Sequence, residues 1–463
     1  MKSSINRKLW RGHSLKARVA VAAIAAVSVA GTSALGVSTA AAKSKGAPLV
    51  VWYDSSRAAY KAAYMAANPG ANIKWVLYNG NANGTGVLQS KFALWNRTGW
   101  PSSAPDVMFD TQNYDAIQLA TAPYNDLLNL KKYVPASVFS KYAGNSEAAA
   151  CGYQGGYYCL RNDNAADLLW VNQTLWNQFF PGQTPPTSWQ QLLTDSQTLQ
   201  ASHPGYLTGD VGDNFDEDFI LWGNQCQLNQ VTKAKTVAIN PLSSNCTGIA
   251  NAIDGAHVIG KSWSQLSLFS SSFPDDHVVM IDAPLWFGGC LTAPGCGEKN
   301  PVPSGTMVAS PPLTSISGAK TTGALGGGLW LVSKHSKNPK AAAAFAQFMS
   351  TSPKIQGTSK VEGGLPDYTP DQSAYLATLG SVYGNPTLTA SSFQTAAAEI
   401  WNGWSPVPWS TDGIWGANVT PNLTSASPST FGSQLEPYAE DLANYARQAG
   451  YSVQSSDKNV SLG

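Results

Sequence analysis

Short apolar runs alternate with helix-like spacings between residues 48 and 120. The runs are four to eight residues long, which is typical of buried strands, while apolar residues three or four apart are typical of helices. Alternation of this kind predicts an α/β domain with a parallel sheet. The predicted strands are Pro48–Tyr53, Ile73–Tyr78 and Pro105–Phe109, and the predicted helices are Arg57–Ala67, Gly84–Trp95 and Asn113–Ala120.

Each of these predicted strands ends in a polar residue, namely Asp54, Asn79 or Asp110. The carboxyl ends of parallel strands meet at one edge of a sheet, where ligands bind in open α/β folds. The sequence therefore predicts a ligand edge here. Each residue could equally cap the helix that follows it.

The segment Val278–Gly289 carries the second strong pattern. A buried strand, Val278–Ile281, ends at Asp282 and leads into a turn that contains Trp286. We expect the chain to cross between two lobes here and Trp286 to line the cleft, although a core strand with a core tryptophan gives the same pattern.

Further helices are expected at Lys340–Met349 and Gly432–Gly450, and a glycine-rich turn that enters a strand at Gly323–Val332. Ser188 and Gln191 have the spacing of a capping box at the start of another helix.

The composition bears on the ligand. Charged residues make up 12% of the chain, about half the ~25% of soluble domains, and there are 16 Trp and 18 Tyr. Few charges and many aromatic rings favour a neutral, hydroxyl-rich ligand that is held by ring faces and amide groups. An ordinary secreted protein with a polar surface would have the same composition. No basic patch occurs outside the N-terminus, so no nucleic-acid partner is expected.

Residues 1–42 are typical of a secretory signal peptide. Six basic residues precede or open an apolar run, Val19–Val37, which is followed by Ala40-Ala41-Ala42 as a cleavage site. Removing the peptide would change the formal net charge from +1 to +1 − 6 = −5. The apolar run is nearly long enough to span a bilayer, so an uncleaved anchor is the alternative.

The six cysteines fall into pairs that are close in sequence. An exported protein meets oxidising conditions, in which each pair could close a small loop. A zinc site is the alternative, but no C-x-x-C motif occurs. The predicted pairs are Cys151/Cys159, Cys226/Cys246 and Cys290/Cys296.

Gly255–Ser262 (GAHVIGKS) formally matches the phosphate-binding pattern G-x-x-x-x-G-K-[ST]. That pattern needs a strand directly before it, and the preceding segment Ile249–Asp254 does not read as one. We interpret the match as chance, and we expect no cofactor and no metal.

The densest group of carboxylates lies in Gly209–Phe219. It could serve a glycoside hydrolase, with Asp213 acting together with Asp216 or Glu217. It could also bind Ca²⁺, or form a solvated loop from which one residue reaches a ligand hydroxyl, and we favour the last. The chain has no G-x-S-x-G and no H-E-x-x-H motif, so no catalytic residue is expected.

Several stretches taken together resemble the extracellular solute-binding proteins of ABC importers, in particular the sugar-binding group that includes maltose-binding protein. Their order and spacing carry the resemblance, which runs from about Pro48 to the C-terminus. Gln190 or Gln191 stands where the family often has an acidic residue. The stretches are PLVVWYDSS, SAPDVMFD, GYYCLRNDNAADLLWVNQTLW, PPTSWQQLL, VVMIDAPLWFGG, GGGLWLVSKHSKNPKAAAAFAQFMS and GGLPDY.

The resemblance implies a two-lobed α/β fold of the type II periplasmic-binding-protein kind. Each lobe would be discontinuous, and a hinge would close the lobes on a ligand in the cleft between them. The expected N-terminal lobe is 43–163 plus 283–346, and the expected C-terminal lobe is 164–282 plus 347–463.

The resemblance also implies a function and a set of contacts. The protein would be a monomer that captures a sugar and delivers it to a membrane permease. It would be secreted, extracellular or held at the cell envelope, and Lys43 stands where lipid-anchored members have a cysteine. An amino acid, a peptide or a polyamine is the alternative ligand. The implied ligand contacts are Tyr53, Asp54, Ser55, Asp110, Asn113, Asp163, Asn164, Asp213, Phe215, Trp286, Gly328 and Trp415.

Overall fold

The computed structural model describes residues 46–78, 87–112, 115–143, 150–292, 301–358 and 364–457. The expected signal peptide lies outside these ranges, as do Asn79, Asn113 and Cys296. Within the described ranges, no helix is both long enough and apolar enough to cross a membrane.

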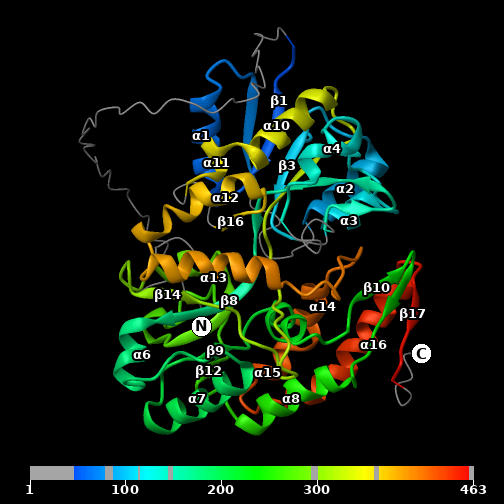
Figure 1. The fold of residues 1–463 in the computed structure, drawn as a ribbon. Helices are drawn as coiled ribbons and strands as arrows, with labels where there is room; N and C mark the ends of the chain where they lie inside the picture. The colour runs from blue at the N-terminus through cyan, green and yellow to red at the C-terminus, as the bar shows by residue number, and fades with distance from the viewer. Residues whose placement is uncertain are drawn as a thin grey trace, which may run out of the picture. The chain divides into compact units, whose positions relative to one another are not determined.

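The first sheet has the strand order β2–β1–β3–β15–β6, and its strands β1 and β3 are labelled in Figure 1. The early strands β1, β2 and β3 are mutually parallel, which confirms the α/β prediction, and β15 is antiparallel to its neighbours β3 and β6. The bounds are β1 (Leu49–Tyr53), β2 (Ile73–Leu77), β3 (Val107–Asp110), β6 (Cys159–Arg161) and β15 (Leu329–Val332).

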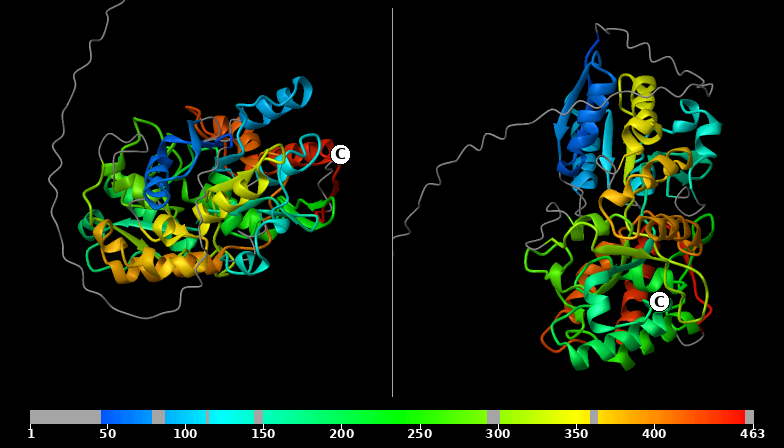
Figure 2. Two further views of the ribbon diagram at one scale, coloured as in Figure 1. Left: turned by 90° about the horizontal axis from the view of Figure 1, so that it is seen from above. Right: turned by 60° about the vertical axis from the view of Figure 1, so that its left-hand side comes forward.

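Alternate residues of this sheet pack against different helices, because successive side chains of a strand point to opposite faces. Val51 and Val107 pack with α1 (Ala58–Ala67), α10 (Pro339–Thr351) and α11 (Pro353–Gln356). Val50 and Met108 pack with α2 (Val87–Thr98) and α3 (Asp115–Ala120) on the other face. In the right view of Figure 2, the blue helix α1 runs alongside the blue strands of the sheet.

The second sheet has the order β13–β8–β14 and is antiparallel throughout. All six residues of the central strand β8 (Asp167–Asn172) are buried, as expected for a strand that is covered on both faces. The neighbours are β13 (Met280–Pro284) and β14 (Met307–Ser310), and α13 (Pro386–Glu399) packs on β14 and β8 (Figure 1).

The side chains change from one core to the other at places that differ from the expected lobe boundaries. The expected boundary at 283 assigned β14 to the first lobe, but the buried apolar side chains of 283–291 and 302–325 lie mostly in the same core cluster as Trp170 of the second sheet. Antiparallel pairing of β13 and β14 with β8 explains this, because it holds both strands beside the second core. The expected boundary at 346 falls inside α10, which packs on the first sheet. In the described residues, the core changes between Leu160 and Ala166, between Leu325 and Leu329, and between Ile355 and Leu365.

The second lobe also contains a small sheet of order β10–β11–β17 beside α16 (Gly432–Gln448) (Figure 1). Its other helices are α6 (Gln173–Phe179), α7 (Trp189–Ser202), η3 (Glu217–Trp222), α8 (Ser244–Ala256), η4 (Asp275–His277), α9 (Phe287–Thr292), α12 (Thr369–Leu376), η5 (Leu379–Ser381), α14 (Thr411–Asn418) and α15 (Thr420–Leu423). The short helices of the first lobe are η1 (Ser55–Arg57), η2 (Leu130–Lys132) and α4 (Ala136–Phe139). The remaining strands are β4 (Gly152–Tyr153), β5 (Gly156–Tyr157), β7 (Asp163–Asn164), β9 (Gly209–Asp210), β10 (Gln230–Lys233), β11 (Thr236–Ala238), β12 (Trp263–Ser264), β16 (Leu365–Pro366) and β17 (Ser452–Gln454).

The predicted local features of the chain are present where the structure describes them. Ser188 Oγ accepts a hydrogen bond from Gln191 N at 3.2 Å and caps α7. The segment before GAHVIGKS is part of helix α8, so that match lacks the strand that a phosphate-binding loop requires.

The structure confirms two of the predicted disulfides. Cys151 bonds to Cys159, and Cys226 bonds to Cys246. Cys290 lies in α9, while its predicted partner Cys296 is outside the described residues, so this pairing stays a prediction.

Candidate functional site

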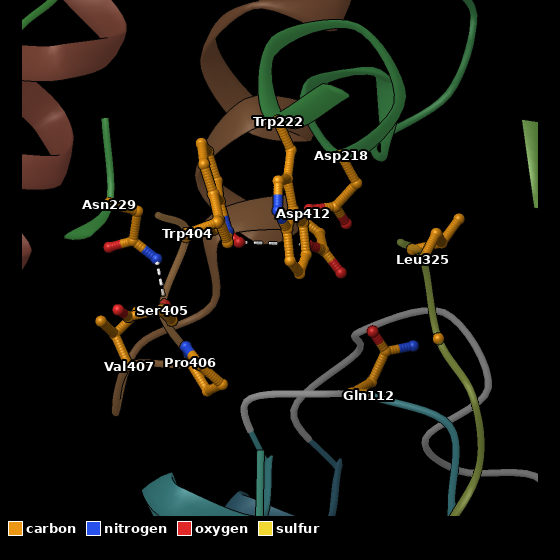
Figure 3. A pocket seen from close by; sticks show the side chains of 12 residues that line it. Gln112, Asp218, Trp222, Asn229, Leu325, Trp404, Ser405, Pro406, Val407 and Asp412 are labelled. Carbon is orange, nitrogen blue, oxygen red and sulfur yellow. Dashed lines mark hydrogen bonds between the residues drawn. The ribbon is translucent and has the colours of Figure 1, made fainter. Parts of the chain in front are cut away.

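A small cavity lies where residues of both lobes meet (Figure 3). Its volume is about 30 Å³, above the ~10–15 Å³ that a cavity needs to hold one water molecule. The first lobe contributes Gln112, and the second lobe and its connecting strand contribute Asp218, Trp222, Asn229, Leu325, Gly326, Trp404, Ser405, Pro406, Val407, Thr411 and Asp412.

Two tryptophans form an aromatic wall of this cavity. The rings of Trp222 and Trp404 are stacked, with centroids 5.6 Å apart and planes at 15° (Figure 3). Trp222 Nε1 donates to the carbonyl of Trp401 at 2.7 Å, and Asn229 Nδ2 donates to the carbonyl of Ser405 at 2.8 Å. These bonds hold the rings and the chain around Ser405 in place, so the wall presents flat apolar faces of the kind on which sugar rings stack.

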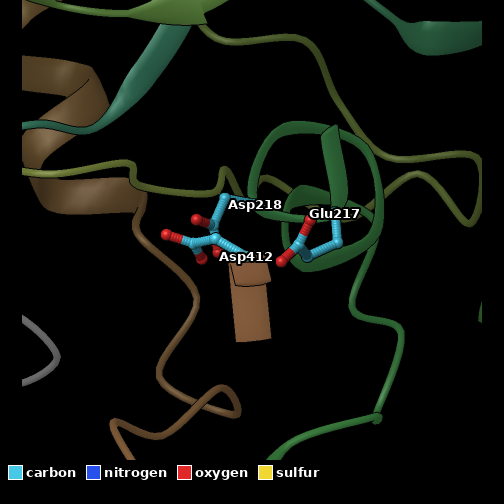
Figure 4. Close-up of side chains that lie close together, drawn as sticks. All are labelled: Glu217, Asp218 and Asp412. Carbon is cyan, nitrogen blue, oxygen red and sulfur yellow. The ribbon is translucent and has the colours of Figure 1, made fainter. Parts of the chain in front are cut away.

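Carboxylates lie beside the aromatic wall. Asp218 comes from η3 and Asp412 from the first turn of α14, and both line the cavity. The neighbouring Glu217 brings a third carboxyl group, and one oxygen of each residue lies within 4.8 Å of the others (Figure 4). All three side chains are buried. A ligand in the cavity would therefore meet an acidic wall as well as an aromatic one.

Burial, more than any other cause, raises the pKa of Glu217 and of Asp218. The pKa of Glu217 is raised well above its usual value by burial and then by the charges of Asp218 and Asp412. The pKa of Asp218 is raised in the same way, by burial and then by Asp412. The site thus favours either protonated carboxyl groups or a positively charged partner.

The local fold explains how Asp218 and Trp222 come to line one cavity. They lie four residues apart in η3, a π-helix whose residues are all buried, and π-helical turns occur frequently at functional sites. Gly323 lies against the backbone of this helix, so closely that an added Cβ would be 1.8 Å from the carbonyl oxygen of Asp218. Only glycine allows this close approach.

The first-lobe side of the cavity follows strand β3. Asp110 Oδ1 accepts a hydrogen bond from Gln112 N at 3.0 Å, which fixes the loop that carries Gln112. Burial, and secondarily the charge of Asp110, raises the pKa of Tyr78 to about 12. Trp286 donates from Nε1 to the carbonyl of Leu325 at 2.9 Å and so lies directly behind the cavity wall.

A larger groove lies beside the chain that carries Trp404 and Asp412. Its volume is about 1030 Å³, enough for a drug-sized ligand or larger. Both lobes line it, and its aromatic members are Tyr124, Tyr153, Tyr158, Trp409, Tyr445 and Tyr451.

The predicted contacts after β1 lie at the edge of the first sheet. Asp54 caps η1, because its Oδ1 accepts from Arg57 N at 3.0 Å and from Ser56 Oγ at 2.6 Å. The ring of Tyr53 contacts Trp75, and its hydroxyl accepts from Lys61 Nζ at 3.4 Å. Ser55 opens η1. These residues stay predicted contacts and do not line the small cavity.

The two residues at the crossover that were predicted to contact ligand form hydrogen bonds with other residues of the protein. Asp163 Oδ1 accepts from Gly328 N at 2.9 Å, and Asn164 Nδ2 donates to Asp367 Oδ1 at 3.3 Å. Burial raises the pKa of Asp367 to about 7, although the charge of Arg161 opposes this shift. These bonds tie together the strands on which the chain passes between the lobes.

Three predicted contacts lie in the core of the second lobe. Asp213 accepts from Ser267 Oγ at 2.8 Å and from Leu268 N at 2.6 Å, so its carboxylate holds a loop. Phe215 and Trp415 are buried in the main cluster, and Trp415 is 0% exposed. Among the described residues, Trp404 instead supplies the tail's aromatic side chain to the small cavity.

The residues that form the cavity wall were missed from the sequence, namely Gln112, Trp222, Trp404, Asp218 and Asp412. The available signals were the dense carboxylates around Asp218 and the Trp- and Pro-rich tail. Neither signal indicates that the two segments meet.

No protein-family model and no curated protein matches the chain. Solved structures do. The galacto-N-biose-/lacto-N-biose I-binding protein of the ABC transporter from Bifidobacterium longum, in complex with lacto-N-biose, has a TM-score of 0.68 at 15% identity over 89% of this chain and 100% of its own. The GacH receptor of Streptomyces glaucescens, studied unliganded and with acarbose, has a TM-score of 0.63 at 19% sequence identity. The match covers 87% of this chain and 98% of the receptor. UgpB from Mycobacterium tuberculosis, in complex with glycerophosphocholine, has a TM-score of 0.64 at 17% sequence identity. The match covers 87% of this chain and 99% of UgpB.

The chain therefore has the two-lobed α/β fold of the solute-binding proteins of ABC transporters. The match extends over nearly the whole of each neighbour. At these identities the likeness establishes the fold, and the ligand has to be argued from the site.

Proposed function

We propose that this protein is the extracellular solute-binding component of an ABC transporter, which captures a sugar between its lobes and delivers it to a membrane permease. The observation that carries the proposal is the cavity to which Gln112 of one lobe and Trp222, Trp404 and Asp412 of the other contribute. Aromatic faces beside amide and carboxylate groups suit the flat apolar faces and hydroxyls of a sugar.

The size of the cavity supports a capture mechanism. A volume of about 30 Å³ is far below the ~300–1,000 Å³ of ligand pockets. A sugar ring needs more room than this, so the cavity would have to widen, by moving Gln112 of the first lobe away from the aromatic and acidic walls of the second. Opening about the crossover strands, followed by closure around the ligand, would meet this requirement. A ligand that contacts both lobes favours the closed form.

The neighbours support the ligand class. Two of them are described with lacto-N-biose and with acarbose, both carbohydrates or carbohydrate-like. UgpB is described with glycerophosphocholine, which shows that the fold also serves other solutes. The sugar assignment of this chain therefore depends on its own aromatic wall. The expected secretion signal and the −5 charge that would remain after its removal agree with an extracellular protein.

The test is the melting temperature of residues 43–463 against a panel of mono- and oligosaccharides, with the sugars analysed afterwards. A ligand at ~1,000 times its Kd adds ~4 kcal/mol, and each kcal/mol raises Tm by roughly 2–4 °C at this size. We expect one sugar class to raise Tm and to be recovered intact. No shift with any sugar would contradict the proposed ligand class.

Sugar cleavage would instead support the alternative of a glycoside hydrolase that uses Asp213, Asp216 or Glu217. The geometry gives this alternative little support. Asp213 is bonded to Ser267 and Leu268, and neither Asp213 nor Asp216 lines the cavity.

A further inference from the structure

The inference concerns the charge of the solute and rests on the proposed function. Composition favours a neutral ligand, but the cavity has an acidic wall formed by Asp218 and Asp412, with Glu217 directly behind it. Each of these side chains is at most 5% exposed. Carboxylates are rarely buried without a partner that offsets the cost of removing them from water.

No residue in the described ranges supplies a cation to Glu217 or Asp218. Among the described residues, the ion pairs involve Asp126 and Asp276, and none involves these two carboxyl groups. Glu217 Oε1 accepts a long hydrogen bond of 3.5 Å from the hydroxyl of Tyr438. Glu217 Oε2 is buried with no hydrogen-bond partner. The carboxyl group of Glu217 lies next to Asp412 in Figure 4, with one of its oxygens within 4.8 Å of oxygens of Asp218 and Asp412, which line the cavity.

The aromatic wall indicates what kind of cation fits. A positive group over the face of Trp is attracted by the ring as well as by carboxylates. Trp222 and Trp404 line the same small cavity as Asp218 and Asp412. A cavity needs ~10–15 Å³ to hold one water molecule, so the volume of about 30 Å³ leaves room for a small polar group such as an ammonium group. A metal ion fits less well, because Ca²⁺ takes six to eight oxygen ligands and indole rings supply none.

We propose that the captured solute is an amino sugar whose protonated amine binds between Asp218, Asp412 and the Trp222–Trp404 pair. The amine would donate charge-assisted hydrogen bonds to the carboxylates, and the sugar ring would continue toward Gln112. Glu217 would act behind them by keeping the electrostatic potential of the wall negative. The amine thereby supplies a positive charge that no described residue places beside Glu217 and Asp218.

The test compares sugars that differ only in the amine. Glucosamine oligomers are titrated calorimetrically against cellobiose and cellotriose, which carry a hydroxyl in place of each amine, in slightly acidic buffer where the amine is protonated. We expect the glucosamine oligomers to bind more tightly. Asp412→Asn should weaken their binding by about 10- to 100-fold, as for a lost hydrogen bond to a charged group. Asp218→Asn is the second variant, and Glu440→Gln, at an exposed position on α16, is the control that should bind like the wild type.

Several results would overturn the inference. If the neutral oligomers bind as tightly, or if both Asn variants bind glucosamine oligomers normally, the amine has no role, while the proposed sugar-binding function stands. If CaCl₂ alone raises Tm and Asp412→Asn abolishes the effect, the wall is a metal site. If glucosamine oligomers do not bind but another sugar of the panel does, only the amino-sugar assignment fails. If no sugar binds, the proposed function fails with it.

Discussion

Glu217 is the residue whose environment is energetically most demanding. It is fully buried, its neighbours Asp218 and Asp412 are acidic, and its Oε2 has no hydrogen-bond partner. Proteins retain such unfavourable groups mainly at functional sites, where the cost to stability serves binding. The acidic wall is therefore expected to destabilise the unliganded protein.

Replacing Glu217 by glutamine is predicted to stabilise the unliganded protein. The folded-state pKa of Glu217 is raised well above its usual value, so the folded state binds more protons than the unfolded state, and stability falls as pH rises above ~4.3. Glu217→Gln removes one titrating group, and its amide oxygen can still accept from Tyr438. At a pH near 8 we expect a gain of about 1–3 kcal/mol, seen as a higher Tm and a shallower decline of Tm with pH.

Glu440→Gln is the control for this prediction, since it removes an exposed carboxylate from the same lobe. Its Tm profile should follow the wild type. A lower Tm for Glu217→Gln at high pH, or an unchanged pH slope, would show that Glu217 is not destabilising.

Trp404 is predicted to contribute more to affinity than Trp415. Trp404 lines the cavity and stacks on Trp222, whereas Trp415 is 0% exposed and contacts Phe431 and Tyr438. Trp404→Ala should weaken sugar binding by about 10- to 100-fold, since stacking and burial of one ring contribute ~1.5–3 kcal/mol. Trp404→Phe should retain part of the affinity. Titration calorimetry would contradict the site if Trp404→Ala binds like the wild type.

For single strands and helices, the local pattern of apolar and polar residues was enough to predict most of those that the structure describes. The expected strand Ile73–Tyr78 corresponds to β2 (Ile73–Leu77), and the expected helix Lys340–Met349 to α10. These segments have clear periodicity because one face of each is buried, and burial of one face requires apolar residues at a regular spacing along the sequence.

The assembly of the elements could not be read in this way. Strand β14 joins the second sheet by pairing with β8, more than a hundred residues earlier in the chain, and no local pattern specifies that partner. The same holds for the site. Asp218 and Asp412 meet only in the folded chain, and the tail has several tryptophans whose burial is decided by tertiary packing.

The crossover segment before β15, which contains Gly327, is predicted to tolerate no side chain at that position. Gly327 has φ +72°, and an added Cβ would lie 2.2 Å from Arg161 Nη2 and 2.5 Å from the carbonyl oxygen of Asp163. Gly327→Ala should therefore cost both the positive-φ penalty of ~1–2 kcal/mol and the energy of relieving the clash.

Gly305→Ala is the matched control, because Gly305 has φ +83° but nothing within 4 Å of an added Cβ. Denaturant unfolding should show a clearly larger loss for Gly327→Ala. Equal losses would mean that the crossover is less tightly packed than the structure indicates.

At the scale of the whole molecule, the chain alternates between two cores, and the cavity lies where residues of both meet. This arrangement couples solute binding to closure of the two lobes, because a solute that contacts both Gln112 and Trp404 holds one residue of each lobe. It also lets a small change of angle at the crossover strands open a site that is only about 30 Å³ in this conformation.

Hydrogen exchange tests this central claim most directly. Backbone exchange of residues 43–463 is measured by mass spectrometry with and without the sugar that gives the largest Tm shift. We expect the ligand to slow exchange both around Gln112 and in the segments 217–222 and 404–412, because the solute is held by both lobes. Protection confined to one lobe, or the absence of protection at 404–412, would contradict capture between the lobes.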